Sequence, residues 1–180
     1  MIGAKLRENG IDFPLMGQAE LSFWQLPAKE RMVLIAAYFC DQVGVKEESR
    51  NRGKWIDRFI TWVKLNPLGR FAWCAAAVSA WSDLAEANYG PKTGRAAVRN
   101  WAKWAKEDNR LGFRPQRGDL FYWLNADGTG HMGIITDATP EFIDSIEANT
   151  SSGKKGSQRD GDGLYRRTRL IKDGMKFIRL

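Results

Sequence analysis

The sequence changes character near residue 112, and this change constrains the fold more than any other feature. Before it lie three helical patterns, at 28–43, from Cys74 to Gly90, and from Thr93, a candidate N-cap, to Gly112. After it come five short β-like runs, at 119–124, 131–136, 142–149, 164–170 and 175–180. Helices followed by strands are typical of α+β domains. The sequence therefore predicts N-terminal helices packed on a roughly five-stranded antiparallel sheet.

Length and composition indicate one folded domain. The chain has 180 residues, of which 43 % are hydrophobic, and this suits a single core. Residues 1–27 lack a sustained period, so we interpret them as an N-terminal extension of unknown role and residues 28–180 as the domain. The longest apolar run, at 32–40, is much shorter than the about 20 residues that span a bilayer, so no membrane span is predicted.

The N-terminus and the cysteines bear on where the protein acts. The first residues lack the apolar stretch of about 7–15 residues found in secretory signals. The two cysteines, Cys40 and Cys74, do not describe a disulfide scaffold, so we expect free thiols and synthesis in the cytoplasm. Any export would then use another route, such as lysis, virion delivery or a dedicated secretion machine.

The chain is basic, with 28 Lys and Arg against 21 Asp and Glu and a formal net charge of +7. Such a charge attracts polyanions, including nucleic acid and anionic cell wall, or serves solubility, since the basic residues are scattered. No nucleic-acid-binding motif accompanies the charge, so nucleic-acid binding would rest on charge alone. No feature indicates an oligomeric state.

Cys74 has the setting of a nucleophile, because it stands where a helical pattern begins. Unpaired N–H groups and the dipole at a helix start lower the pKa of a thiol. The alanines that follow allow close packing while leaving the thiol accessible. A small buried residue in an apolar helix is the alternative interpretation of Cys74, and the commoner fate of a free cysteine. Cys40 lies in the apolar stripe of the first helix and is interpreted as structural.

His131 is the only histidine of the chain, and it follows a hairpin-like turn and opens a strand. Any Cys–His chemistry must therefore use it. Such a base needs a carboxylate or an amide to orient its ring, and Glu147 and Asn149 are candidates that share one strand face. Taken alone, this pair also fits the exposed end of an edge strand.

Together and in this order, these motifs resemble the CHAP branch of the NlpC/P60 superfamily, papain-like hydrolases that cleave amide bonds of peptidoglycan. The segments that carry the resemblance are Trp73-Cys74-Ala75-Ala76 for the nucleophile helix, Arg117-Gly118-Asp119-Leu120-Phe121 for the turn into the first core strand, Gly130-His131-Met132-Gly133-Ile134-Ile135 for the histidine strand, and Ile146-Glu147-Ala148-Asn149-Thr150 for the acidic and amide pair. The resemblance spans about residues 30–172.

The resemblance implies a papain-like fold and acyl transfer without a cofactor. Cys74 would attack an amide carbonyl, His131 would move the proton, and Glu147 or Asn149 would hold the imidazole. N–H groups at the helix start, including that of Cys74, would meet the oxyanion. The implied partner is peptidoglycan, and the implied activity is that of an endopeptidase or an N-acetylmuramoyl-L-alanine amidase.

Other residues complete the set of candidates. Trp73 and Trp123 are expected to line a sugar or peptide groove, although core packing explains most of the tryptophans. The stretch Asp160-Gly161-Asp162-Gly163 is similar to a calcium loop, but Ile171 stands where the closing Glu would fall, so no metal site is predicted.

Two other functions compete with wall hydrolysis. One is a non-catalytic basic module that binds cell wall or nucleic acid, which would need none of Cys74, His131, Glu147 and Asn149. The other is a papain-like protease or acyltransferase with a different substrate.

Overall fold

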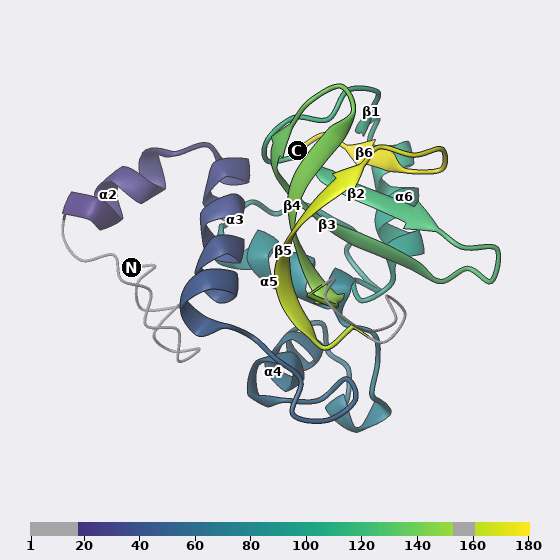
Figure 1. Cartoon of the computed structure of the whole chain (residues 1–180). Coiled ribbons are helices and arrows are strands. Elements are labelled where there is room, and N and C mark those ends of the chain that lie inside the picture. The colour runs from purple at the N-terminus through teal and green to yellow at the C-terminus, as the bar shows by residue number, and fades with distance from the viewer. Residues whose placement is uncertain (1–17, 153–160) are drawn as a thin grey trace.

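The computed structural model describes residues 18–152 and 161–180. Helices fill the first part of this chain and strands the second, as the sequence predicts (Figure 1). The helical elements are α2 (Gln18–Gln25), α3 (Ala28–Ala37), the π-helical turn η1 (Tyr38–Val43), α4 (Lys54–Trp62), the 3-10 turn η2 (Pro67–Gly69), α5 (Cys74–Leu84) and α6 (Val98–Glu107). The strands are β1 (Leu111–Gly112), β2 (Leu120–Leu124), β3 (Gly130–Ala138), β4 (Phe142–Thr150), β5 (Gly163–Leu170) and β6 (Lys176–Ile178). None of the helices in these ranges has the length and apolarity that crossing a bilayer requires.

The strands form one antiparallel sheet in the order β1-β6-β2-β3-β4-β5. Five of them correspond to the five predicted runs. The sixth strand, β1, was not predicted, because its two residues are too few to display the alternation that identifies a strand. The fold is therefore α+β, with N-terminal helices packed on a six-stranded sheet rather than a five-stranded one.

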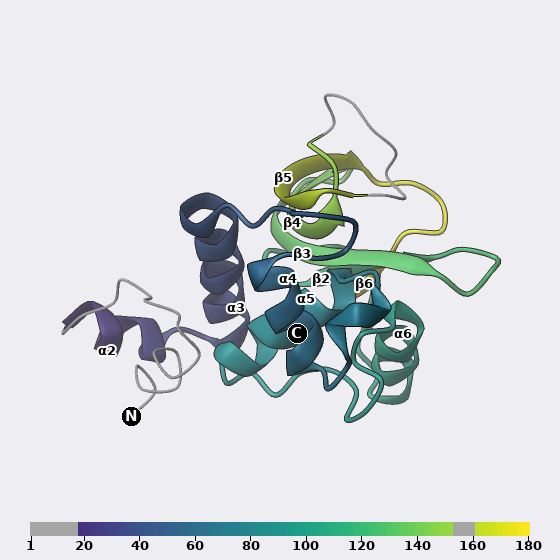
Figure 2. The same ribbon diagram turned by 90° about the horizontal axis from the view of Figure 1, so that it is seen from below.

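Helix α5 lies at the centre of the larger hydrophobic core. All of its residues except Asp83 are buried, and it contacts β3, β4, α3 and α4. Figure 2 shows the helices gathered on one side of the sheet, with α5 beneath β3. The small side chains of 75–77 bring the helix close to the strands. A second, smaller cluster covers the other face of the sheet and consists of Phe121, Ile135, Ile143 and Phe177.

The helix boundaries differ from the prediction in three places. Helix α4 was not predicted, although Ile56, Phe59 and Ile60 recur at helical spacing and are buried. Helix α5 ends at Leu84 instead of at Gly90, because the hydroxyl of Ser82 bonds both the N–H and the carbonyl of Tyr89 and turns the chain back. Helix α6 begins at Val98, so the prediction of a helix from an N-cap at Thr93 was wrong. The residues between form a loop that later lines the site.

The predicted N-terminal extension is described only in part, since residues 1–17 lie outside the described residues. Its described part contains α2, whose Phe23 is 3 % exposed and belongs to the larger core. Arg31 of α3 donates to the backbone carbonyls of Trp24 and Leu26, and to that of Ala85. The end of the extension is thus packed against the domain.

Candidate active site

Cys74 is the first residue of α5, as the sequence predicts. The helix is entered from Trp73, whose carbonyl accepts from the N–H of Ala77. The first N–H groups of a helix have no partner within it, so the helix start presents unpaired donors and a positive dipole end beside the thiol. Cys74 is 3 % exposed.

His131 is the second residue of β3 and is largely buried, with 9 % of its surface exposed. It pairs across the sheet with Trp123 of β2, whose ring centroid lies 4.8 Å from that of the imidazole. The preceding turn is tied by hydrogen bonds from Asn125 to Thr129 and from Thr129 to Asp127. The only imidazole of the chain is thereby held on a rigid strand.

Glu147 of β4 is the residue that holds the ring. Its Oε2 lies 2.8 Å from Nε2 of His131, and its side chain has no exposed surface. Gly133 makes room for it, because a Cβ at that position would lie 3.0 Å from Cγ of Glu147 and 2.8 Å from the ring of Phe121. The structure thus contains the contact that the sequence predicts between Glu147 and the imidazole. With Nε2 engaged, Nδ1 is the ring nitrogen left to face Cys74.

Arg169 of β5 completes the surroundings of Glu147. Its guanidinium donates from Nε to Oε1 and from Nη2 to Oε2 of the carboxylate, each at 2.5 Å. The hydroxyl of Ser145 donates to Oε1 at 2.7 Å. Including the bond to His131, the carboxylate therefore makes four hydrogen bonds, which a buried charge requires. The sequence analysis did not identify Arg169. The signal available for it was the two-residue alternation along β5, which places Arg169 on the same face of the sheet as Glu147.

The interactions within this cluster favour the charged forms of both His131 and Glu147. Burial opposes the charge on His131, but its side-chain interactions with Cys74 and Glu147 outweigh burial and raise the pKa of the imidazole from 6.5 to about 9. Burial likewise opposes the charge on Glu147, but hydrogen bonds from His131 and Arg169 lower the pKa of that carboxyl from 4.5 to about 2. His131 is therefore protonated and Glu147 ionised at neutral pH.

Asn149 does not take part in this cluster in the way that the strand alternation predicts. Within the described part of the chain, the side chain of Asn149 makes no hydrogen bond to the His131 ring, whose Nε2 contacts Glu147 instead. A β-bulge between Ala148 and Thr150 interrupts the alternation, and Asn149 itself has a φ of 56° in the left-handed region. The two-residue period on which the shared face rested therefore stops before Asn149, which is 8 % exposed.

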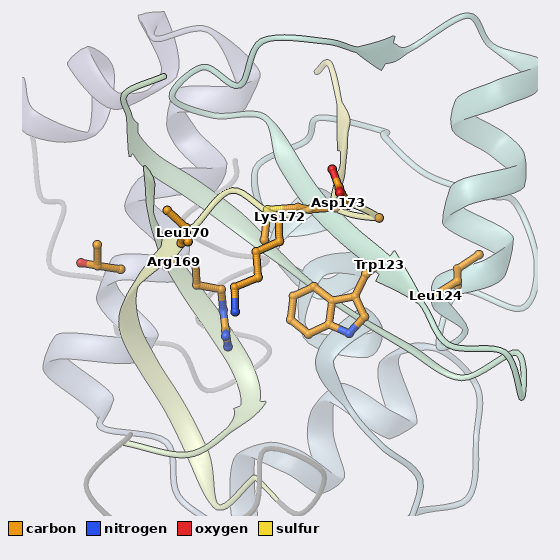
Figure 3. A pocket seen from close by; sticks show the side chains of 9 residues that line it. Trp123, Leu124, Arg169, Leu170, Lys172 and Asp173 are labelled. Atoms are coloured by element: carbon orange, nitrogen blue, oxygen red, sulfur yellow. The ribbon is translucent and has the colours of Figure 1, made fainter. Parts of the chain in front are cut away.

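The two tryptophans that were expected to line a groove have different positions. Trp73 is fully buried, stacks on Phe59 and donates from Nε1 to Glu47, so it packs in the core and has no surface to offer a groove. Trp123 is half-buried and lines a cavity of about 470 Å³ together with Arg169 and Lys172 (Figure 3). Arg169 lies over its ring at 5.2 Å, so the tryptophan also covers the Glu147 cluster.

A larger groove of about 940 Å³ has Cys74 in its wall. The rest of the wall comes from four stretches in the helical part of the chain and from the end of the β2–β3 turn with the first residue of β3. These are residues 62–65, 71–72, 83, 92–100 and 128–130. Gly130, next to His131, is part of this lining and fits closely, because a Cβ there would lie 2.4 Å from the carbonyl of Trp123. The groove therefore lies against Cys74, next to the strand that carries His131.

Two further observations concern metals and known proteins. Among the described residues, no three His, Cys, Asp or Glu side chains are grouped so that they could hold a metal ion, and Asp160 of the calcium-loop-like stretch lies outside those residues.

Comparison with known protein families, curated proteins and solved structures finds no significant match to this chain. The function of this chain must therefore be inferred from its own residues and their geometry.

Proposed function

We propose that this protein is a cysteine hydrolase that cleaves amide bonds in the stem peptides of peptidoglycan. The observation that carries the proposal is the constellation of Cys74 at a helix start, His131 beside it and Glu147 on the far nitrogen of the imidazole, at the wall of an open groove. Nucleophile, base and orienting acid are the three parts that covalent acyl transfer requires. A module that only binds needs none of them.

In the proposed reaction, the proton of the Cys74 thiol resides on His131, whose pKa is raised by its contacts with Cys74 and Glu147, and the sulfur attacks the amide carbonyl as a thiolate. The N–H groups at the start of α5 stabilise the oxyanion. His131 then protonates the leaving amine nitrogen, so the C–N bond breaks and a thioester remains on Cys74. A water molecule, deprotonated by His131, attacks the thioester and releases the carboxylic acid and the free thiol.

Glu147 supports each of these proton transfers by orienting the ring and stabilising the imidazolium. It remains ionised because Arg169 and Ser145 bond the oxygens that His131 leaves available. Asn149 is proposed to shape the site or assist the oxyanion, since it follows Glu147 at the bulge without bonding the ring.

The choice of peptidoglycan as substrate is supported by the resemblance of the four motifs to the CHAP branch of the NlpC/P60 superfamily. The α+β architecture, with the cysteine on a helix and the histidine on the sheet, is compatible with the papain-like fold of that superfamily. The net charge of +7 would favour attachment to an anionic wall.

The experiment is incubation of the protein with purified wall fragments, followed by mass spectrometry of the products. We expect a new free amine and a new carboxylate at one position of the stem peptide, and the fragment masses distinguish endopeptidase from amidase cleavage. Cys74→Ala is the control and should release nothing. Intact wall fragments with the wild-type protein would overturn the proposal, and cleavage of unrelated peptides alone would favour the protease alternative.

A further inference from the structure

The groove beside Cys74 carries an uncompensated positive charge. Lys64, Lys92 and Arg99 line it, and all three side chains are exposed. Within the described residues, no ion pair joins any of them to an acid. Charged side chains of both signs normally intersperse on a protein surface, so three like charges around one hollow create a local field.

The fourth cation and the single acid of the lining neutralise each other. Arg95 donates to both oxygens of Asp83, at 2.6 and 2.8 Å, and Trp62 donates to the same carboxylate at 2.8 Å. Because Asp83 lies on α5, this pair also attaches the loop 92–97 to that helix. The hydroxyl of Ser79, also on α5, donates to the carbonyl of Arg95 and adds a second attachment. Arg95 therefore holds the groove wall in place, while the other three cations remain available to a ligand.

The rest of the lining is compatible with a peptide. Val63, Leu65 and Phe71 contribute apolar surface, and 41 % of Phe71 is exposed. Apolar walls with a few convergent charged groups are typical of ligand sites, where the walls supply burial and the charges fix orientation. A ligand in this groove would lie along an apolar wall, with its anionic groups on the cations and a carbonyl near the thiol.

We infer that this groove selects substrates that carry free carboxylates close to the scissile amide, and that Lys64, Lys92 and Arg99 recognise those carboxylates. The inference deepens the proposed function, on which its peptide substrate rests. The recognition itself is a property of the groove and does not require hydrolysis. It can therefore be tested separately from catalysis.

The first experiment uses Cys74 as a reporter of the charge around it. We compare its alkylation by iodoacetate, which is anionic, and by iodoacetamide, which is neutral. Both reagents are used on the wild-type protein and on the triple variant Lys64→Gln/Lys92→Gln/Arg99→Gln. The ratio of the two rate constants cancels any change in thiol ionisation, which affects both reagents alike. The ratio of the iodoacetate rate constant to the iodoacetamide rate constant should fall about three- to eightfold in the triple variant at low ionic strength, and it should respond less to added salt than the wild-type ratio.

Lys103→Gln is the matched control. Lys103 lies on α6, one helical turn beyond Arg99, is exposed and does not line the groove. Lys103→Gln removes one unit of charge, as each of the three groove substitutions does, and it breaks only a surface ion pair with Glu107, which contributes little to stability. We expect the wild-type ratio in this variant. An equal fall in the control, or no fall in the triple variant, would overturn the inference.

The second experiment uses two synthetic stem peptides, one with free carboxylates and one with the same carboxylates converted to amides. We expect wild-type kcat/KM to favour the free form and the triple variant to lose that preference. Equal cleavage of both peptides by the wild type would overturn the inference while leaving the proposed hydrolase intact. If neither peptide is cleaved, the proposed function fails, and the alkylation ratio alone decides whether the groove recognises anions.

Discussion

The two cysteines lie in regions that differ mainly in their charged neighbours. Cys40, in η1, is half-buried, its thiol faces the carbonyl of Leu164 at 3.8 Å, and burial together with the charge of Asp41 raises its pKa to about 11. Cys74 is even less exposed, but it begins a helix and interacts with His131. Burial alone would therefore make Cys74 the less reactive thiol. The comparison shows that the imidazole and the helix start, not exposure, set the two apart.

The largest expected effect comes from removing each thiol in turn. Cys74→Ala should reduce hydrolysis of wall fragments by at least about 10³-fold, because the proposed acyl-enzyme forms on the Cys74 sulfur. Cys40→Ala should keep activity within about twofold, since Cys40 touches no proposed reacting group. Product release measured by mass spectrometry, with circular dichroism to verify folding, tests both variants. Substantial activity in Cys74→Ala would contradict the proposed mechanism.

The next effect concerns Glu147, the acid that contacts the imidazole beside Cys74. Glu147→Gln keeps the shape of the side chain but removes its charge, so we expect kcat to fall about 10²–10³-fold through poorer orientation and stabilisation of the imidazolium. Steady-state kinetics on a soluble stem peptide measure this change. Asn149→Ala is the comparison variant, and its loss should be much smaller. A larger effect at Asn149 than at Glu147 would reverse the assigned roles.

Thiol reactivity compares the two regions directly. At neutral pH a neutral alkylating reagent should label Cys74 at least about 100-fold faster than Cys40, because the raised pKa leaves Cys40 with very little thiolate. Peptide mapping after timed labelling gives the two rates in one sample. His131→Ala should narrow the difference. Preferential labelling of Cys40 would show that exposure governs reactivity after all.

The smallest expected effect is a titration of the single histidine. NMR of the His131 ring should give a midpoint near pH 9 in the wild type, and a midpoint lower by about one pH unit or more in Cys74→Ala or Glu147→Gln, since each removes an interaction that raises the pKa. A midpoint near 6.5 in the wild type would contradict the ion pair between the protonated His131 ring and the Glu147 carboxylate.

The same shift predicts how stability depends on pH. The pKa of His131 is raised on folding, so its contribution to the free energy of unfolding, at most about 3 kcal/mol, is fully present below pH 6.5 and is lost as the pH rises through about 9. The pKa of Glu147 is lowered, so its contribution is present above pH 4.5 and is lost as the pH falls towards about 2. Urea unfolding at several pH values tests both directions, with His131→Ala as the control for the alkaline limb.

Local patterns predicted the elements of the site better than its contacts. The helical pattern placed the start of α5 at Cys74, and the turn before His131 placed that residue at the beginning of β3. Both are short-range features, since a helix start or a hairpin turn is determined by a few neighbouring residues. The two-residue β1 and the loop before α6 lacked such local signals, and both were missed.

Contacts between strands were harder to predict because they depend on register. Glu147 and Arg169 are 22 positions apart, and only the pairing of β4 with β5 brings the guanidinium to the carboxylate. The bulge after Ala148 likewise decides that Glu147 and not Asn149 bonds the imidazole. Trp73 followed the same rule, because its burial against Phe59 depends on how α4 and α5 pack.

By itself, the sequence determined the α+β division of the chain, the helix start at Cys74 and the identity of the sole imidazole, since these follow from composition and from interactions between near neighbours. Tertiary structure alone decided which acid contacts His131, that Arg169 pairs with this acid, and that Lys64, Lys92 and Arg99 line one groove with Cys74. The physical reason is that charges and hydrogen bonds act over a few ångströms in space. Residues distant in the sequence come within that range only when the sheet register and the helix packing are in place.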